Sequence, residues 1–256
     1  MQRHPSKSPL LLVLSLVTLA GCEPPPVNNN PTPDPIESTT TEIQFNVTVP
    51  PETPADATLF LVGSHQVLRG IDGRGVELVY QGGEQFSLKV RVPKEQGFTY
   101  RLQLFQGAEK QVALDEAGAV QGELSFSTGT ETEKMVDSTV SRWGPETGAP
   151  TEPQLTFVVQ VPEETPRNAP VWLSGNHELL GNWSDAGVEL YKALGNRYAT
   201  TLSFPQGTAL EFKATRGSPD TVETGPSGEE VGNHTHTTVG GFERVTVTVS
   251  TWKDIP

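Results

Sequence analysis

The chain contains an internal repeat, and this repeat constrains the fold more than any other feature. A shift of 112 positions without a gap places Phe45 on Phe157, Gly63 on Gly175 and residues 75–78 on residues 187–190. Farther along, the register drifts by three residues, so that Trp143 matches Trp252. Self-similarity at one offset indicates copies of a single structural unit. We therefore expect two domains, at residues 42–143 and 154–256, joined by a Pro- and Gly-rich linker at residues 144–153.

Alternating apolar residues predict strands in both copies, and no helical period extends beyond a turn or two after residue 21. In the first copy the alternating residues are Ile43, Phe45, Val47 and Val49; Phe86, Leu88, Val90 and Val92; and Phe98, Tyr100 and Leu102. In the second they are Leu155, Phe157, Val159 and Val161; Tyr198, Thr200, Leu202 and Phe204; Leu210 and Phe212; and Val245, Val247 and Val249. The sequence predicts an all-β protein of two tandem sandwiches. Trp143 and Trp252 close their copies at matched positions, so we expect both to be structural.

A tryptophan follows a turn in the second copy. The strand pattern around Val171 and Leu173 ends at Gly175-Asn176, and a second turn, Gly181-Asn182, directly precedes Trp183. An indole has an apolar face and one N–H donor, so Trp183 either folds back over the core or remains outside as a stacking platform. Packing is slightly favoured by the sequence, since large aromatic side chains are mostly buried.

Four short motifs occur in order in this copy: LSGN at 173–176, LGNW at 180–183, FPQGT at 204–208 and LEFK at 210–213. Their order and spacing resemble those of the starch-binding domain, the family-20 carbohydrate-binding module. The resemblance covers about the last hundred residues. It implies an immunoglobulin-like β-sandwich that binds α-glucans by stacking sugar rings on tryptophans.

The resemblance also implies a sugar site made of Trp183, its neighbour Asn182, Lys213 and Asn233. The family's second tryptophan is missing, because residues 217–231 contain no aromatic residue. Loss of one aromatic platform would weaken binding by about 0.5 to 1.5 kcal/mol beyond the lost contact area. In the first copy Ile71 replaces Trp183, Arg101 replaces Lys213 and Asn233 has no counterpart. We do not expect that copy to bind a glucan.

The N-terminus has the layout of a secretory signal at residues 1–21: Arg3 and Lys7, then an apolar run, then Leu19-Ala20-Gly21-Cys22. The last four residues resemble a bacterial lipobox, which implies cleavage before Cys22 and lipidation of that residue, the single cysteine in the chain. Glu23 follows, which under the sorting rule for Gram-negative lipoproteins favours the outer membrane. Residues 22–41 are rich in Pro, Asn and Thr and predict a disordered tether.

Charge and motif content exclude several functions. The net charge is −13, and removal of residues 1–21, which carry two cations and no acid, makes it −15. An acidic chain without a basic patch argues against nucleic acid and leaves the lipid anchor as the membrane contact. No G-x-S-x-G motif occurs, and acid pairs such as Glu163-Glu164 point apart on extended backbone. We expect no catalytic activity and no cofactor.

Three histidines are candidates for a metal site. His234 and His236 would project from one face of a strand, with His177 as a third candidate. A zinc site needs a third ligand and an ordered second shell. The favoured interpretation is a pair of exposed strand histidines and no metal.

Two functions remain open. The first is a surface-anchored, non-catalytic lipoprotein whose second domain binds a polysaccharide of the α-glucan type. The second is a structural or adhesive lipoprotein that uses the same fold as a spacer or to contact an envelope protein, its sugar site having decayed. Fold alone does not decide between them.

Overall fold

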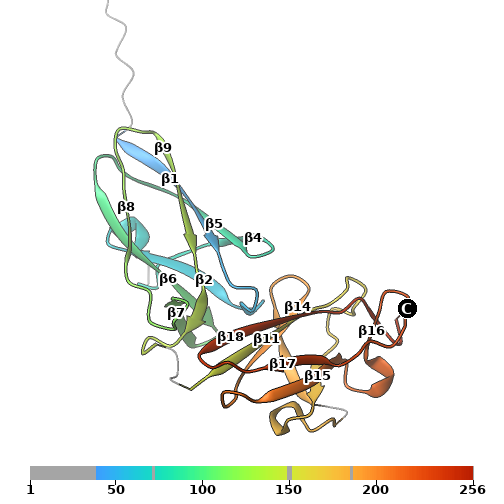
Figure 1. Ribbon diagram of the computed structural model, residues 1–256. Helices are drawn as coiled ribbons and strands as arrows, with labels where there is room; N and C mark the ends of the chain where they lie inside the picture. The colour runs from blue at the N-terminus through green and yellow to red at the C-terminus, as the bar shows by residue number, and fades with distance from the viewer. Residues whose placement is uncertain (1–38, 71–72, 149–151, 185–186, 256) are drawn as a thin grey trace, which may run out of the picture. The chain divides into compact units, whose positions relative to one another are not determined.

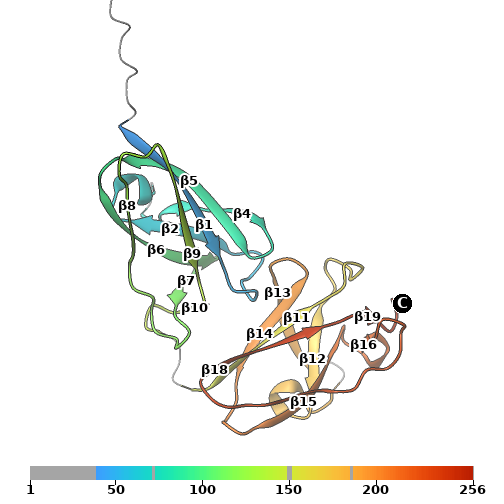
Figure 2. The same cartoon turned by 45° about the horizontal axis from the view of Figure 1, so that its top comes forward.

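The computed structural model describes residues 39–70, 73–148, 152–184 and 187–255. The predicted signal peptide, Cys22, most of the tether and Ile71 lie outside the described residues. The described part consists of strands and three short 3-10 turns, arranged as two β-sandwich domains (Figures 1 and 2). The all-β, two-domain prediction is confirmed. In these residues no helix has the length and apolar character needed to cross a membrane.

The first domain consists of two sheets. One has the order β4 (Val79–Gly82), β5 (Gln85–Pro93), β1 (Thr40–Thr48), β9 (Glu133–Thr139). The other has the order β10 (Arg142–Gly144), β7 (Glu109–Leu114), β6 (Gly97–Gln106), β2 (Thr58–Gly63), β3 (Val76–Glu77), with β8 (Leu124–Ser127) also on β6 and the turn η1 (Gln66–Leu68) after β2. The pairs are antiparallel except β1 with β9, which is parallel.

The second domain repeats this plan. Its strand order is β17 (His234–Thr237), β15 (Ala209–Thr215), β12 (Val171–Gly175), β13 (Val188–Ala193), β14 (Arg197–Ser203), β11 (Gln154–Gln160), β18 (Phe242–Thr248). The remaining elements are the pair β16 (Glu223–Thr224) and β19 (Thr251–Trp252) and the turns η2 (Glu178–Leu180) and η3 (Pro219–Thr221). Strand β11 runs parallel to β18, as β1 does to β9. One strand, β13, pairs with both β12 and β14, where the first domain uses β3 and β4.

Period-2 alternation places the repeated apolar residues inside. Phe45 is fully buried and lies edge-on to Tyr100, with ring centroids 5.2 Å apart. Phe157 is fully buried in the second core and meets Phe212 edge-on at 5.1 Å. Each domain therefore has an aromatic centre at equivalent places.

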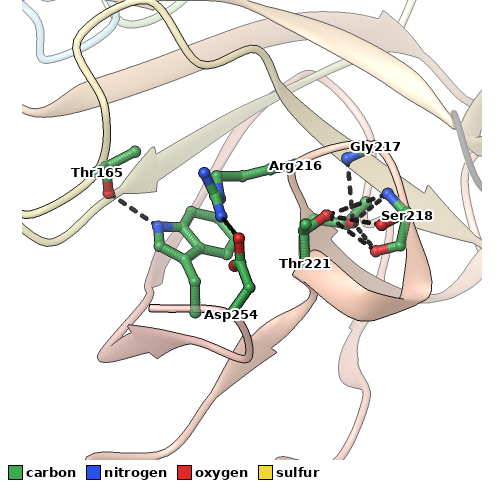
Figure 3. A network of polar contacts seen from close by, with 8 residues as sticks. Thr165, Arg216, Gly217, Ser218, Thr221 and Asp254 are labelled. Atoms are coloured by element: carbon green, nitrogen blue, oxygen red, sulfur yellow. Dashed lines mark hydrogen bonds and ion pairs between the residues drawn. The ribbon is translucent and has the colours of Figure 1, made fainter. Parts of the chain in front are cut away.

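The repeat extends to individual hydrogen bonds. Trp143 Nε1 donates to Thr53 Oγ1 at 3.0 Å, and Trp252 Nε1 donates to Thr165 Oγ1 at 2.8 Å, the latter visible in Figure 3. Trp252 is fully buried and Trp143 is half-buried. The prediction that both tryptophans are structural is confirmed, because each indole N–H is used inside its own domain.

Candidate functional site

A strained turn places Trp183. The imidazole Nδ1 of His177 accepts from Leu179 N at 3.2 Å and caps η2. The next three residues, Gly181, Asn182 and Trp183, are all left-handed, with φ of 79°, 48° and 61°. Such a backbone costs a residue with a Cβ about 1–2 kcal/mol. The Trp183 amide donates to the Gly175 carbonyl at 2.7 Å, which holds the turn against β12.

This turn leaves the Trp183 side chain outside the core. It is 45% exposed, whereas Leu180, one turn earlier, is fully buried. The interpretation that Trp183 folds back over the core is wrong. The residue that fills that place is Leu180, and the left-handed backbone directs the indole away from it. Backbone strain of this kind concentrates at functional sites.

Two adjacent strands form the floor beside the indole. Ser174 on β12 pairs with Lys213 on β15, and Trp172 pairs with Thr215. Phe212 and Ala214, which alternate with these two residues on β15, point into the core, so Lys213 and Thr215 lie on the opposite face, where Thr215 is covered to 4% exposure. The Ser174 hydroxyl donates to the Ser184 carbonyl at 2.7 Å. This hydrogen bond links the Trp183 turn to the floor.

Turn and floor enclose a shallow groove of about 150 Å³. Its lining consists of Ser174, Trp183, Ser184, Lys213, Thr215, Ser218, Pro219 and Val222. Cavities that enclose a drug-sized ligand measure about 300–1,000 Å³. This groove is too small to enclose a long chain, and it suits contact with the faces and hydroxyls of a ligand that lies on the surface.

Lys213 supplies the groove's cation. Its side chain is only 15% exposed, and its Nζ lies 3.4 Å from Glu230 Oε1, whose side chain is 89% exposed. The alkyl stem is therefore covered while the ammonium remains at the groove. An exposed ion pair of this type contributes at most about 1 kcal/mol, so the ammonium can exchange Glu230 for a ligand oxygen at small cost.

The structure brings Trp183 and Lys213 together but not the other two predicted site residues. The Asn233 amide donates to Glu211 Oε2 at 3.0 Å and is not part of the groove lining. Asn182 is the middle residue of the left-handed turn and is not part of the lining either.

The candidate metal residues have other partners. His234 Nε2 lies 2.9 Å from Glu223 Oε2, and His236 Nε2 lies 2.8 Å from Glu243 Oε2. Their side chains are 33% and 24% exposed. The interpretation of exposed strand histidines is wrong, because both rings face the core side of β17, opposite buried Phe212 and Leu210. Within the described ranges no group of three or more His, Cys, Asp or Glu side chains could hold a metal.

Sequence reasoning missed six residues of the groove. Four come from the Trp183 turn and from the loop that leaves β15, and two belong to the floor. The six are Ser174, Ser184, Thr215, Ser218, Pro219 and Val222. Strand alternation could have found Ser174 and Thr215, which share a face with Lys213. The loop residues carry no comparable signal.

An exposed indole beside a surface groove, on the face of a β-sandwich, is an arrangement typical of a binding module. Comparisons with known proteins agree with this class. Residues 153–244 match the family model described as Starch binding domain (CBM_20), which places a starch-binding domain in the second half of the chain.

Two curated proteins are similar to part of this chain. An Alpha-amylase from Niallia circulans is 44% identical over 108 residues, which are 42% of this chain and 8% of that protein. An Amylopullulanase from Thermoanaerobacter thermohydrosulfuricus is 36% identical over 106 residues, 40% of this chain and 7% of that protein. The chain thus spans less than a tenth of these relatives' length.

Among solved structures, the chain is similar to the family 20 CBM of a maltotetraose-forming amylase from Pseudomonas saccharophila. The identity is 18%, the TM-score is 0.30, and the alignment covers 37% of this chain and 98% of that one.

Proposed function

We propose that this protein is a non-catalytic carbohydrate-binding protein whose second domain binds polysaccharide of the α-glucan type on Trp183. One observation carries the proposal. A tryptophan that the core does not need is held 45% exposed by three consecutive left-handed residues, beside a lysine that lines the same groove. Natural sequences retain such strain where function requires the geometry.

The chemistry of the groove suits a sugar. The flat face of an indole contacts the apolar C–H face of a pyranose ring, and the ammonium of Lys213 and the hydroxyls of Ser184 and Ser218 are partners for ring hydroxyls. The match of residues 153–244 to the starch-binding family supports the same ligand class. The acidic net charge of −13 suits a neutral ligand better than a polyanion.

The binding test is Trp183→Ala in the full chain. Truncation should weaken binding to soluble starch by roughly 1–3 kcal/mol, about 5- to 150-fold in Kd, because the platform is lost. The melting temperature should change little, since a side chain outside the core leaves no cavity. Affinity electrophoresis and calorimetric melting measure the two quantities.

Leu179→Ala is the matched control. Leu179 is 40% exposed on the same turn but does not line the groove, so its truncation should leave binding unchanged. A parent protein that binds no starch, glycogen or other glucan would refute the proposal. The spacer or protein-contact alternative would then account for the missing aromatic residue in 217–231.

We also propose that Cys22 carries a lipid anchor in the outer membrane of a Gram-negative envelope, with residues 22–39 as the tether; the predicted tether ended at residue 41, but Thr40 and Thr41 belong to β1. The basic, apolar and Leu-Ala-Gly-Cys order of the first 22 residues supports this proposal. Cys22→Ser should leave the precursor uncleaved or release the protein from the membrane fraction. Normal processing and membrane retention of the Ser variant would contradict it.

A further inference from the structure

We propose that Pro219 provides the second face of the glucan site, so that a sugar ring lies between the indole of Trp183 and the pyrrolidine ring of Pro219. This inference rests on the proposed function and deepens it. It assigns a ligand-binding role to a loop that contains no aromatic residue.

Pro219 belongs to the same groove as Trp183 but comes from a different segment. Trp183 follows η2 after β12, and Pro219 opens η3 after β15; the floor between these segments is the Ser174–Lys213 pair. Pro219 is exposed, and it lines the groove together with Ser218 and Val222. Two of these three side chains are apolar, so this side of the groove presents an aliphatic surface toward the ligand.

Hydrogen bonds within the loop hold it in shape before any ligand arrives. Thr215 Oγ1 accepts from the amides of Gly217 and Ser218, both at 3.2 Å, and donates to the Ser218 carbonyl at 2.8 Å. Ser218 and Thr221 form a capping box around η3. Figure 3 shows this cluster of short contacts. The loop therefore does not depend on the ligand for its conformation.

Contacts with the C-terminal segment anchor the loop from the other side. Lys253 Nζ donates to the Pro219 carbonyl at 3.2 Å and to Asp220 Oδ1 at 3.1 Å. Arg216 pairs with Asp254 (Figure 3), and its guanidinium carbon lies 5.6 Å from the ring centroid of buried Trp252. The Pro219 carbonyl and the next residue, Asp220, are thereby linked to the C-terminal segment.

A prefolded proline suits this role physically. Proline has no rotamer entropy to lose when a ligand covers it, and a loop ordered in advance avoids the ordering cost of binding. It offers apolar contact but no π face. The site should hence bind more weakly than one with two aromatic faces, and an aromatic residue at position 219 should strengthen it.

The experiment measures maltoheptaose binding to the full chain by calorimetry for the parent, Pro219→Trp, Pro219→Gly and Pro226→Trp. Pro226 is the matched control, because it is an exposed loop proline of the same domain that does not line the groove. Pro219→Trp should bind about 2- to 12-fold more tightly, the effect of one aromatic face. Pro219→Gly should bind more weakly than the parent, and Pro226→Trp should equal it.

The outcomes separate the two proposals. If the parent binds maltoheptaose and both Pro219 variants have the same affinity as the parent, the Pro219 assignment alone is overturned. The same holds if Pro226→Trp gains as much affinity as Pro219→Trp. A parent that does not bind overturns the proposed function and this inference with it. Unchanged melting temperatures would exclude misfolding as the cause of any loss.

Discussion

The edge strand that pairs with β6 in the first domain and with β15 in the second carries apolar side chains in the first domain and histidines in the second. In the first, β8 places Leu124 and Phe126 opposite Tyr100 and Phe98 of β6. In the second, β17 places His234 and His236 opposite Phe212 and Leu210 of β15. Residues 98 and 100 correspond to residues 210 and 212 at the repeat offset of 112. The imidazoles therefore occupy the places of a leucine and a phenylalanine.

In each domain the inward side chains of this edge strand have partners within the same domain. Phe126 stacks on Phe98 with centroids 4.9 Å apart and meets Phe45 edge-on at 5.3 Å. His234 instead pairs with Glu223, a residue only 2% exposed whose other oxygen accepts from Ala214 N at 2.7 Å. One fold tolerates both solutions because an edge needs its inward side chains covered and its polar atoms paired, not a given residue type.

The largest loss of stability is expected when the two equivalent tryptophans, Trp143 and Trp252, are truncated. Trp252→Ala should destabilise the second domain by roughly 4 kcal/mol, since a fully buried indole leaves a large cavity. Trp143→Ala should cost the first domain about half as much, because Trp143 is half-buried. Hydrogen exchange of peptides from each domain, followed through a urea titration, reports the two separately. Equal losses of stability in the two variants would contradict the expectation that the more buried tryptophan contributes more.

A smaller effect is expected at the edge itself. Phe126→Ala should cost the first domain roughly 3 kcal/mol through lost ring contacts. His236→Ala should cost the second domain only about 1–2 kcal/mol, because Glu243 keeps the amides of Val239 and Gly240 as donors. The same exchange experiment compares them. If His236→Ala lost as much stability as Phe126→Ala, the His236 ring would contribute as much packing energy as the Phe126 ring, contrary to this prediction.

The smallest effect should be the pH dependence that Glu243 gives to the second domain. Burial by itself raises the pKa of Glu243, but the bonds from Gly240 N, His236 and Val239 N outweigh it and hold that pKa below the ordinary 4.5. A carboxyl with a lowered folded pKa stabilises the protein above its unfolded pKa, and this contribution is lost as pH falls through the folded value.

Urea midpoints of the second domain at pH 7 and at pH 3 measure this dependence. Glu243→Gln should lower the midpoint at pH 7 and reduce its change toward pH 3. Glu230→Gln, at a side chain that is 89% exposed, is the control and should alter neither. An identical acid response in the parent and in Glu243→Gln would remove Glu243 as the source.

The sequence by itself determined the fold class, the repeat and the cores. Strand alternation is a local pattern of period 2, so Phe45 and Phe157 could be placed inside without coordinates. The alignment of the copies, with its drift of three residues, also linked Trp143 to Trp252, and each of these indoles donates a hydrogen bond to a threonine of its own domain. Motif order indicated Trp183 and Lys213 as groove residues, and they line one groove.

Only the tertiary structure decided what depends on residues far apart in the chain. The exposure of Trp183 follows from left-handed backbone and from Leu180 filling the core beneath the turn. Pro219 lines the groove in a loop whose carbonyl accepts a hydrogen bond from Lys253, 34 residues later. His236 becomes an inward partner of Glu243 through strand pairing. No period or propensity encodes such contacts, since their energy arises between segments that meet only after the sandwich has closed.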